Sequence, residues 1–340
     1  MRIVARAPGK LVLLGEYAVL DGAPALVLAI DRHAVATLEP SRDGECSLRT
    51  LSPEPIERRF APGAPSGAPL VDIVTAGARG APAWRGSLDS TELYSGQTKL
   101  GLGSSAAALC AFAGAWSAYL RAGGVAVPAP TLHDLIRLHR AFQGGRGSGI
   151  DVAASVAGGV VEFRLDASGM PRIGSVRLPN SVGFAGIFAG RSASTPEFVA
   201  RYRDFQAARP AEAAAMIRRL SAAAEAGCAA AHGEAADAFV EAIADYGRGL
   251  RDLGVAIGAD IVTAEHRQIG EHARRHGVAY KVSGAGGGDL GIACATDRAA
   301  LVAFATAVRE QGFRVLELGV AERGLTVNET ADEHVGERLG

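Results

Sequence analysis

The chain has 340 residues, 48% of them hydrophobic and 21% charged, so it can bury a large core as an ordinary globular protein does. A formal net charge of -1 excludes a global field that would attract nucleic acid or an anionic membrane, so we expect neither as a partner. The sequence has no apolar run long enough to span a membrane, its first residues are too short in apolar residues to predict a signal peptide, and its four scattered cysteines form no C-x-x-C pair. We therefore expect a cytoplasmic protein with reduced cysteines, either a monomer or a homodimer.

The N-terminal half combines strand patterns with helix patterns. Residues 52–69 are rich in Pro, Gly and Ala and predict a loop or an insertion. Residues 105–121 and 131–142 predict helices, the second with Asp134 in its first turn. Strands are predicted at residues 3–14, with an interruption at Pro8-Gly9, and at 25–30, 33–38, 45–51, 160–164 and 182–189.

The C-terminal half is dominated by alanine-rich helical patterns, and we place a domain boundary near residues 165–180. The predicted domains are residues 1–170 and 171–340, and the polar tail after Val327 is expected to be loose. Strands and helices do not alternate regularly, which favours an α+β fold over a doubly wound sheet. The predicted helices are 196–209, 211–232, 235–253 and 258–276, and the predicted strands are 279–283, 291–295 and 314–320.

One segment, Lys99-Leu-Gly-Leu-Gly-Ser-Ser-Ala-Ala-Ala108, indicates an anion site. Its glycines let backbone N–H groups approach a ligand, and one of its serines is a natural N-cap for the helix that follows. A glycine turn entering a helix N-terminus favours a phosphate, typically that of a nucleotide. The alternative is a helix cap without a ligand. A dinucleotide fingerprint is disfavoured because residues 92–99 are polar, not a buried strand, and no acid follows about twenty residues later.

Two further segments carry candidate charged groups. Lys10 lies on a strand after a Pro-Gly turn, where a lysine can reach between two phosphates, although a lone lysine is more often simply solvated. Glu16 has the same parity as Lys10 but lies roughly 20 Å along the strand, too far for a direct pair. Asp151 ends the run Gln143-Gly-Gly-Arg-Gly-Ser-Gly-Ile-Asp151 and could orient or deprotonate an acceptor, hold a metal, or cap residues 152–156.

Two glycine-containing loops in the second half complete the set. Lys281-Val-Ser-Gly-Ala-Gly-Gly-Gly-Asp-Leu-Gly291 contains more glycines than a plain hairpin turn needs, which indicates close approach of the backbone to a ligand or to another backbone. In Gly190-Arg-Ser-Ala-Ser-Thr-Pro-Glu197, Ser194 and Glu197 match a capping box, with Arg191 beside the predicted helix start. The capping box is a sufficient structural explanation, and the same helix start could also receive an anion.

Taken in this order, the segments resemble the GHMP kinase superfamily. Pro8-Gly-Lys10 with Gly15-Glu16 resembles its first motif, Gly101-Leu-Gly-Ser-Ser-Ala106 its ATP-phosphate loop, and Gly284-Ala-Gly-Gly-Gly288 its third motif. Within the superfamily, the loops resemble those of the phosphomevalonate kinases. Mevalonate kinases usually carry a magnesium-ligating glutamate where this chain has Gln143, and an amide cannot supply that charge.

The resemblance implies an α+β fold of two domains, the first ribosomal-S5-like and the second ferredoxin-like, with ATP and Mg²⁺ in the cleft between them. It implies that Lys10 and Asp151 are catalytic, that Ser104 and Ser105 hold phosphate and magnesium, and that Ser105 is the metal ligand. The residues implied to bind ATP are Lys99, Gly101, Leu102, Gly103, Ser104, Ser105 and Ala106. Those implied to bind the acceptor, besides Lys10 and Asp151, are Arg146, Ser148, Gly149, Arg191, Ser192, Ser194, Gly286 and Gly287.

The acceptor that the resemblance implies is 5-phosphomevalonate, a small phosphomonoester. Its second pKa is about 6, so the attacking oxygen is already ionised near neutral pH and little remains to deprotonate. We therefore expect Lys10 to matter more than Asp151, with Lys99, Arg146 and Arg191 as candidates to hold the acceptor phosphate. Alternatives are a mevalonate kinase or another small-alcohol kinase, the ATP-dependent decarboxylase of diphosphomevalonate, and a non-catalytic member of the same fold.

Overall fold

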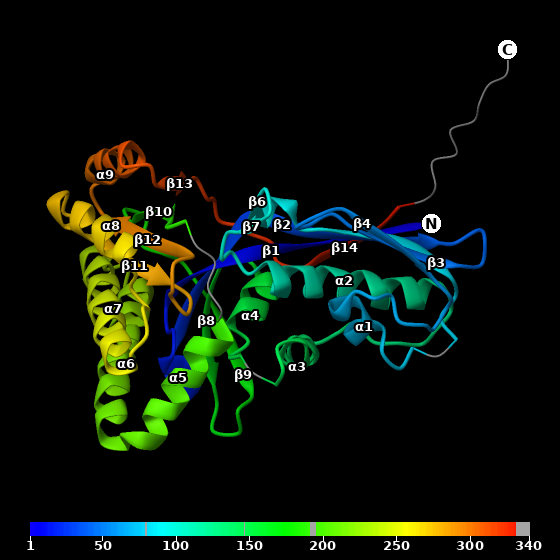
Figure 1. The fold of residues 1–340 in the computed structure, drawn as a ribbon, viewed down its shortest axis with the longest axis horizontal. Coiled ribbons are helices and arrows are strands. Elements are labelled where there is room, and N and C mark those ends of the chain that lie inside the picture. The colour runs from blue at the N-terminus through cyan, green and yellow to red at the C-terminus, as the bar shows by residue number, and fades with distance from the viewer. Residues whose placement is uncertain (79, 146, 191–194, 331–340) are drawn as a thin grey trace, which may run out of the picture.

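The computed structural model describes residues 1–78, 80–145, 147–190 and 195–330. Within these residues, eight strands form a large sheet with the order β14-β1-β2-β5-β3-β4, and β8 joins it by pairing with both β2 and β9. Helices α1 to α4 lie along one face of this sheet (Figure 1). The strands are β1 (Arg2–Leu14), β2 (Ala25–Pro40), β3 (Cys46–Thr50), β4 (Ile56–Phe60), β5 (Trp84–Asp89), β8 (Val160–Leu165), β9 (Pro171–Val176) and β14 (Thr326–Thr330). The helices are α1 (Pro69–Thr75), α2 (Ser104–Ala122), α3 (Leu132–Phe142) and α4 (Ile150–Ala157).

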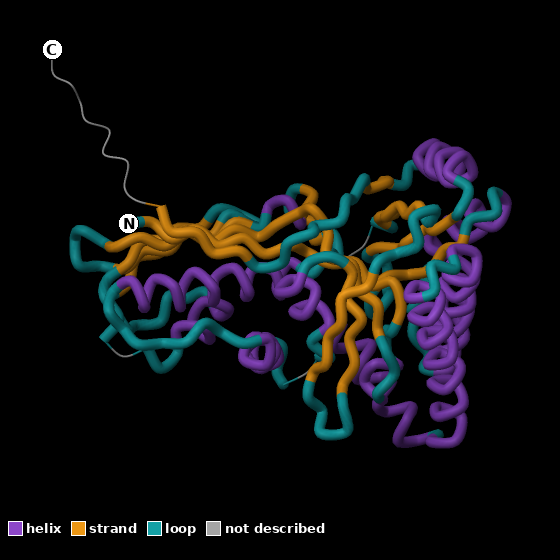
Figure 2. The backbone as a smooth tube through the Cα atoms, turned by 180° about the vertical axis from the view of Figure 1, so that it is seen from behind, coloured by secondary structure: helices purple, strands orange, loops and turns teal. Residues whose placement is uncertain are grey.

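A second, smaller sheet lies at the other end of the molecule, as Figure 2 shows from behind. It is antiparallel, with the order β11-β12-β10-β13, and α7, α8 and α9 pack against its strands. The strands are β10 (Gly183–Phe188), β11 (Ala279–Ser283), β12 (Leu290–Ala295) and β13 (Arg314–Leu316). The helices are α5 (Thr195–Ala208), α6 (Pro210–His232), α7 (Ala236–Ala256), α8 (Ala264–Arg275) and α9 (Arg298–Glu310).

The core is centred on α2, which is buried along nearly its whole length from Ser104 to Leu120. A helix that is apolar on all sides needs partners on all sides, and α2 packs on β1 and β2 as well as on α1, α3 and α4. Its aromatic rings Phe112 and Trp116 each lie with their centroids 5.9 Å from that of Trp84. This packing fixes the direction of α2, and so fixes where its N-terminus points.

The α+β class predicted from the sequence is confirmed, and most of the long helices begin and end close to their predicted limits, whereas α8 begins six residues after the predicted start at residue 258. The predicted interruption at Pro8-Gly9 is wrong: β1 continues through it, and the strand pairing shifts register there. The predicted strands 25–30 and 33–38 are one strand, β2. Residues 52–69 are not only a loop, because they contain β4, and α1, β5 and α9 were not predicted.

The end of the described chain returns to the large sheet. β14 pairs antiparallel with β1, so the expectation of a loose tail after Val327 is wrong for residues 328–330, while residues 331–340 lie outside the described part. Both β9 and β14 belong to the large sheet although they follow residue 170, and the division into residues 1–170 and 171–340 stays a prediction. In the described residues, no helix is long and apolar enough to cross a membrane.

Two small elements complete the part of the fold that positions the site. The 3-10 helix η1 (Ala18–Asp21) follows β1, and η2 (Thr91–Leu93) precedes a short antiparallel hairpin, β6 (Tyr94–Ser95) with β7 (Thr98–Lys99). The hairpin leads directly into the glycine turn before α2. Residues 92–99 are thus not the buried parallel strand that a dinucleotide fingerprint requires, as the sequence indicated.

Candidate active site

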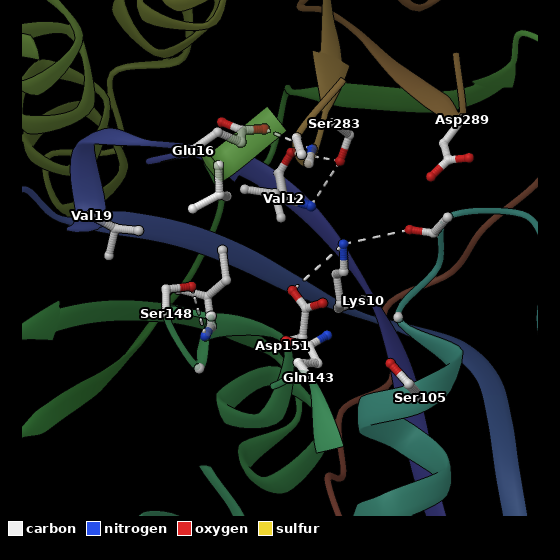
Figure 3. Close-up of a pocket in the computed structure, with 18 of the residues that line it drawn as sticks. Lys10, Val12, Glu16, Val19, Ser105, Gln143, Ser148, Asp151, Ser283 and Asp289 are labelled. Atoms are coloured by element: carbon white, nitrogen blue, oxygen red, sulfur yellow. Dashed lines mark hydrogen bonds and ion pairs between the residues drawn. The ribbon is translucent and has the colours of Figure 1, made fainter. Parts of the chain in front are cut away.

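A pocket lies where β1, the start of α2, the segments 139–151 and the loop after β11 meet, and it contains about 1120 Å³ of empty space including its open mouth. Figure 3 shows the side chains of Lys10, Ser105, Asp151, Ser283 and Asp289 around it. These segments are far apart in the sequence. Packing of α2 and α4 against β1 and β2 brings together β1, the start of α2 and the start of α4.

Lys10 occupies the centre of this pocket. The residue is only 6% exposed, and its Nζ lies 3.5 Å from the carbonyl oxygen of Gly101 and 3.6 Å from Oδ1 of Asp151. Its backbone N–H donates to the carbonyl oxygen of Leu102 at 2.9 Å, which ties β1 to the glycine turn. A Cβ added at Gly103 would lie 2.7 Å from Cγ of Lys10, so a glycine there is needed for the lysine stem to pass.

The start of α2 is built by Gly103. This residue has φ 76°, in the left-handed region, and it occupies the N-cap position without a side-chain hydrogen bond from any described residue. The prediction that a serine caps this helix is therefore wrong: Ser104 is already the first helical residue, and its hydroxyl lies 3.5 Å from that of Tyr94. The first amides of a helix lack intrahelical partners, so this end can donate to an anion.

Asp151 is the second residue of α4. The N-cap of α4 is Gly149 at φ 96°, so the alternative in which Asp151 caps residues 152–156 is not what the structure has. A Cβ on Gly149 would lie 2.8 Å from Ile136, and the glycine is what lets this turn pack against α3. The turn presents the Asp151 carboxylate to Lys10, as Figure 3 shows.

Helix α3 and the residue that caps its C-terminus supply two pocket residues that the site prediction did not include. His139 and Gln143 are one helical turn apart, and both line the pocket. Nε2 of His139 lies 3.1 Å from the hydroxyl of Ser105. Burial lowers the pKa of His139; the negative charge of Asp151 opposes this effect, and Lys99 and Lys10 add to it. The sequence signal that could have found them is their spacing: His139 and Gln143 are four positions apart at the end of a predicted helix, so both lie on the same side next to a glycine loop.

The third glycine loop forms the opposite wall. A Cβ on Gly286 would lie 2.5 Å from the carbonyl oxygen of Ile261, and the N–H of Gly287 donates to the same oxygen at 3.0 Å. Asp289 follows this loop and also lines the pocket. A Cβ on Gly101 would lie 2.8 Å from that of Asp289, so the first glycine turn and this loop are in direct contact.

The structure brings most of the described predicted site residues to this one pocket. Those that line it are Lys10, Lys99, Gly101, Gly103, Ser105, Ser148, Gly149, Asp151 and Gly286. Leu102, Ser104 and Ala106 are buried in the turn and the first residues of α2, and the N–H of Gly287 donates to Ile261; none of these four is among the lining residues. Arg146, Arg191, Ser192 and Ser194 lie outside the described residues.

Oxygen donors for a divalent cation are present but sparse. In the described part of the chain, no group of three or more His, Cys, Asp and Glu side chains could hold a metal ion. Around Lys10 the pocket offers the Ser105 hydroxyl, the Asp151 carboxylate and the Gln143 amide, and the Asp289 carboxylate lines its opposite wall. Mg²⁺ is usually held by one or two carboxylates together with substrate phosphates and water, so this donor set fits a metal that enters with a nucleotide.

Comparison with known proteins agrees with this geometry. The family model described as GHMP kinases N terminal domain matches residues 93–159, the segment from η2 to the end of α4. The chain is 28% identical to the phosphomevalonate kinase of Streptomyces sp. (strain CL190), over 86% of this chain and 89% of that protein. It is 27% identical to the mevalonate kinase of Thermococcus sibiricus, over 97% and 99%.

A solved structure shows the same fold. The Streptococcus pneumoniae phosphomevalonate kinase in complex with phosphomevalonate and AMPPNP superimposes with a TM-score of 0.75 at 19% identity, covering 93% of this chain and 99% of that one. The chain therefore has the fold of a small-molecule kinase, and residues 93–159 match the N-terminal domain of the GHMP kinases. Over most of its length the sequence is similar to phosphomevalonate and mevalonate kinases.

Proposed function

We propose that the protein is an ATP-dependent phosphomevalonate kinase of the mevalonate route to isoprenoids. It would transfer the γ-phosphoryl group of ATP to 5-phosphomevalonate and release ADP and 5-diphosphomevalonate. The observation that carries the proposal is the buried Lys10 ammonium beside a pocket wall that presents Gln143 where mevalonate kinases usually carry a glutamate. An uncharged amide at this position suits a dianionic acceptor better than a carboxylate would, because like charges repel.

Lys10 has the main electrostatic role in this proposal. Both reactants are anionic, so a cation between them stabilises the charge that develops on the transferred group. Asp151 lies 3.6 Å from Lys10 Nζ and can hold the ammonium in place. Because a phosphomonoester is largely ionised at neutral pH, Asp151 is needed less as a base than it would be for an alcohol.

The nucleotide is assigned to the glycine turn and the start of α2. The turn 101–103, with the first amides of α2, faces the pocket beside Lys10 and supplies donors for phosphate oxygens. The Ser105 hydroxyl, held by His139, and the Asp151 carboxylate are the groups we expect to hold Mg²⁺. The ion, bound with ATP, would neutralise part of the phosphate charge.

The test is a coupled assay of ADP release by the purified full-length protein with three acceptors: 5-phosphomevalonate, mevalonate and 5-diphosphomevalonate. We expect the highest kcat/KM with 5-phosphomevalonate, and no release of CO₂ with 5-diphosphomevalonate. A higher kcat/KM with mevalonate would replace the proposal by a mevalonate kinase. That second candidate is favoured by the 32% identity to the mevalonate kinase of Aeropyrum pernix, which extends over 48% of this chain.

A further inference from the structure

A buried ion pair joins the two parts of the molecule beside the pocket. Nζ of Lys281, in β11, lies 2.5 Å from Oε1 of Glu16, which follows β1. The side chain of Lys281 is fully buried and that of Glu16 is 3% exposed. Figure 3 shows Glu16 and Ser283 side by side above Val12. Neither Glu16 nor Lys281 has a role in the proposed chemistry.

The pair belongs to a line of polar contacts between β1 and the β11 loop, which we name the seam and define as Val12, Glu16, Tyr17, Lys281, Ser283, Gly284 and Ala285. Ser283 Oγ accepts from the N–H of Val12 and donates to its carbonyl oxygen, both at 2.9 Å. The hydroxyl of Tyr17 donates to the carbonyl oxygen of Ala285 at 2.6 Å. Residues separated by about 270 positions in the sequence are thus held together through defined hydrogen bonds.

The pair is retained at a cost. Two charges removed from water must recover their hydration energy from each other, and well-packed apolar residues often stabilise a core as well. Burial lowers the pKa of Lys281, and Glu16 opposes that effect. The second carboxylate oxygen of Glu16, Oε2, is buried and accepts no hydrogen bond from any described residue. A feature that stabilises so inefficiently calls for a role other than stability.

Its geometry points to the catalytic lysine. Oε1 of Glu16 also accepts from the N–H of Gly284 at 3.1 Å, so the carboxylate holds the first residue of the glycine loop 284–288. A Cβ on Gly284 would lie 3.8 Å from Lys10 Nζ. The carboxylate of the ion pair thus contacts the loop at a residue that lies next to the Lys10 ammonium.

We propose that Glu16 and Lys281 form a positioning pair that holds the 284–288 loop against Lys10 for phosphoryl transfer. The proposal rests on the proposed function, because it assigns the pair to that same site. Neither side chain needs to touch a reactant. Misplacement of a reacting group by about 1 Å costs on the order of a hundredfold in rate, so a shift of this loop would be seen in kcat.

The test compares four variants with the wild-type full-length chain. Lys281→Met and Glu16→Gln each break the pair, and the double variant Glu16→Gln/Lys281→Met removes both charges, so that no unpaired charge remains buried. Tyr246→Phe is the control: it removes the hydroxyl that donates to the backbone carbonyl oxygen of Glu16 at 2.6 Å, but keeps the ring that lies 5.7 Å from Lys281 Nζ and keeps both charges of the pair. The readouts are kcat, KM for each substrate, thermal stability, and amide hydrogen exchange in the segment 280–290.

We expect faster exchange in 280–290 and a kcat at least about tenfold lower in the double variant, with KM for the acceptor changed much less. Tyr246→Phe should lower thermal stability while its kcat and its exchange in 280–290 stay as in the wild type. If a single variant does not fold, the double variant decides. Wild-type kcat or wild-type exchange in the double variant, or an equal loss of kcat in Tyr246→Phe, would overturn the positioning role.

The exchange measurement needs no substrate, so the two proposals fail separately. If the wild type phosphorylated mevalonate and not 5-phosphomevalonate, the proposed function would be wrong. The kcat comparison would then be made with mevalonate, and the same outcomes would support or overturn the positioning pair.

Discussion

The two helices whose first turns line the pocket, α2 and α4, begin differently from several other helices of the molecule. α2 and α4 each begin at a glycine with positive φ, Gly103 and Gly149, which has no side chain to cap the helix. α3, α8 and α9 begin at Thr131, Thr263 and Asp297, whose side chains accept hydrogen bonds from first-turn amides. The positive φ is the distinguishing feature, because α6 and α7 also lack a side-chain cap bond from the described residues.

The difference shows that a helix start can either be stabilised by a side-chain cap or leave its first amides accessible to a ligand. A side-chain cap satisfies amides that would otherwise be unpaired, which typically contributes about 1 kcal/mol. A glycine in the left-handed region leaves those amides uncovered and lets neighbouring groups come close. At Gly103 the close neighbour is the stem of Lys10, and at Gly149 it is Ile136 of α3. The pocket is therefore built where helix starts are left uncapped.

The largest expected effect comes from removing the cation that faces these uncapped starts. Lys10→Ala should lower turnover by well over tenfold, because two anionic groups would then meet without a positive charge between them. Asp151→Asn should cost clearly less, since it keeps an oxygen near Lys10 and little deprotonation is needed. Steady-state kinetics with 5-phosphomevalonate measure both. Abolished activity in Asp151→Asn beside near-normal activity in Lys10→Ala would contradict these roles.

The second prediction concerns the glycine at the start of α2. Gly103→Ala should reduce kcat by about tenfold, because its Cβ would displace the Lys10 stem and the backbone is held at φ 76°. Gly169→Ala is the matched control: φ is 77°, and among the described residues no atom lies within 4 Å of the added Cβ. The control should lose stability in urea unfolding but keep its kcat. Equal losses of kcat in both variants would show that the effect of Gly103→Ala does not arise from displacement of Lys10.

A smaller effect is expected at a capped helix. Thr131 and Asp134 form a reciprocal capping box at the start of α3, on the exposed surface. Thr131→Ala should lower the free energy of unfolding by about 1 kcal/mol and leave kcat and KM unchanged. Chemical denaturation and the coupled assay check the two halves of this statement. A drop in kcat would show that capping on α3 also controls the pocket through His139 and Gln143.

The smallest expected effect is a pH dependence. Burial lowers the pKa of His139 in the folded protein, although the negative charge of Asp151 opposes this effect. In the unfolded chain the histidine is exposed and has a pKa of about 6.5. The unfolded chain therefore binds the proton more readily, so this contribution to stability is complete above about pH 6.5 and is lost as the pH falls toward the lowered value. His139→Gln should lose less unfolding free energy than the wild type between about pH 7.5 and 5.5. An equal loss would show that His139 does not titrate differently on folding.

The local features of the site were readable from the sequence because they depend on residues close together in the chain. Glycines in the turn 101–103 and a lysine after Pro8-Gly9 indicated a phosphate site, and Lys10 lies at the centre of the pocket. Asp134 in the first turn of α3 was predicted and forms its capping box. The uncapped start of α2 was not predicted. A serine after a glycine is a typical N-cap, and the sequence does not show that Gly103 itself takes the N-cap position with a positive φ.

Long-range pairings were not readable. Glu16 was set aside as too far from Lys10, and its partner, Lys281, is 265 residues away. β14 carries the polar residues of an expected loose tail, yet pairs along β1. Periodicity reports which face of an element is apolar and says nothing about which distant element covers it.

The sequence by itself determined the class of the fold and indicated which loops could approach an anion, because glycine freedom, helix periodicity and charge act over a few residues. Only the tertiary structure decided that the loops share one pocket, that His139 lies 3.1 Å from the Ser105 hydroxyl, and that the buried ion pair of Glu16 and Lys281 contacts the loop 284–288. The physical reason is that burial and long-range pairing depend on how the elements pack, and packing is a property of the whole chain.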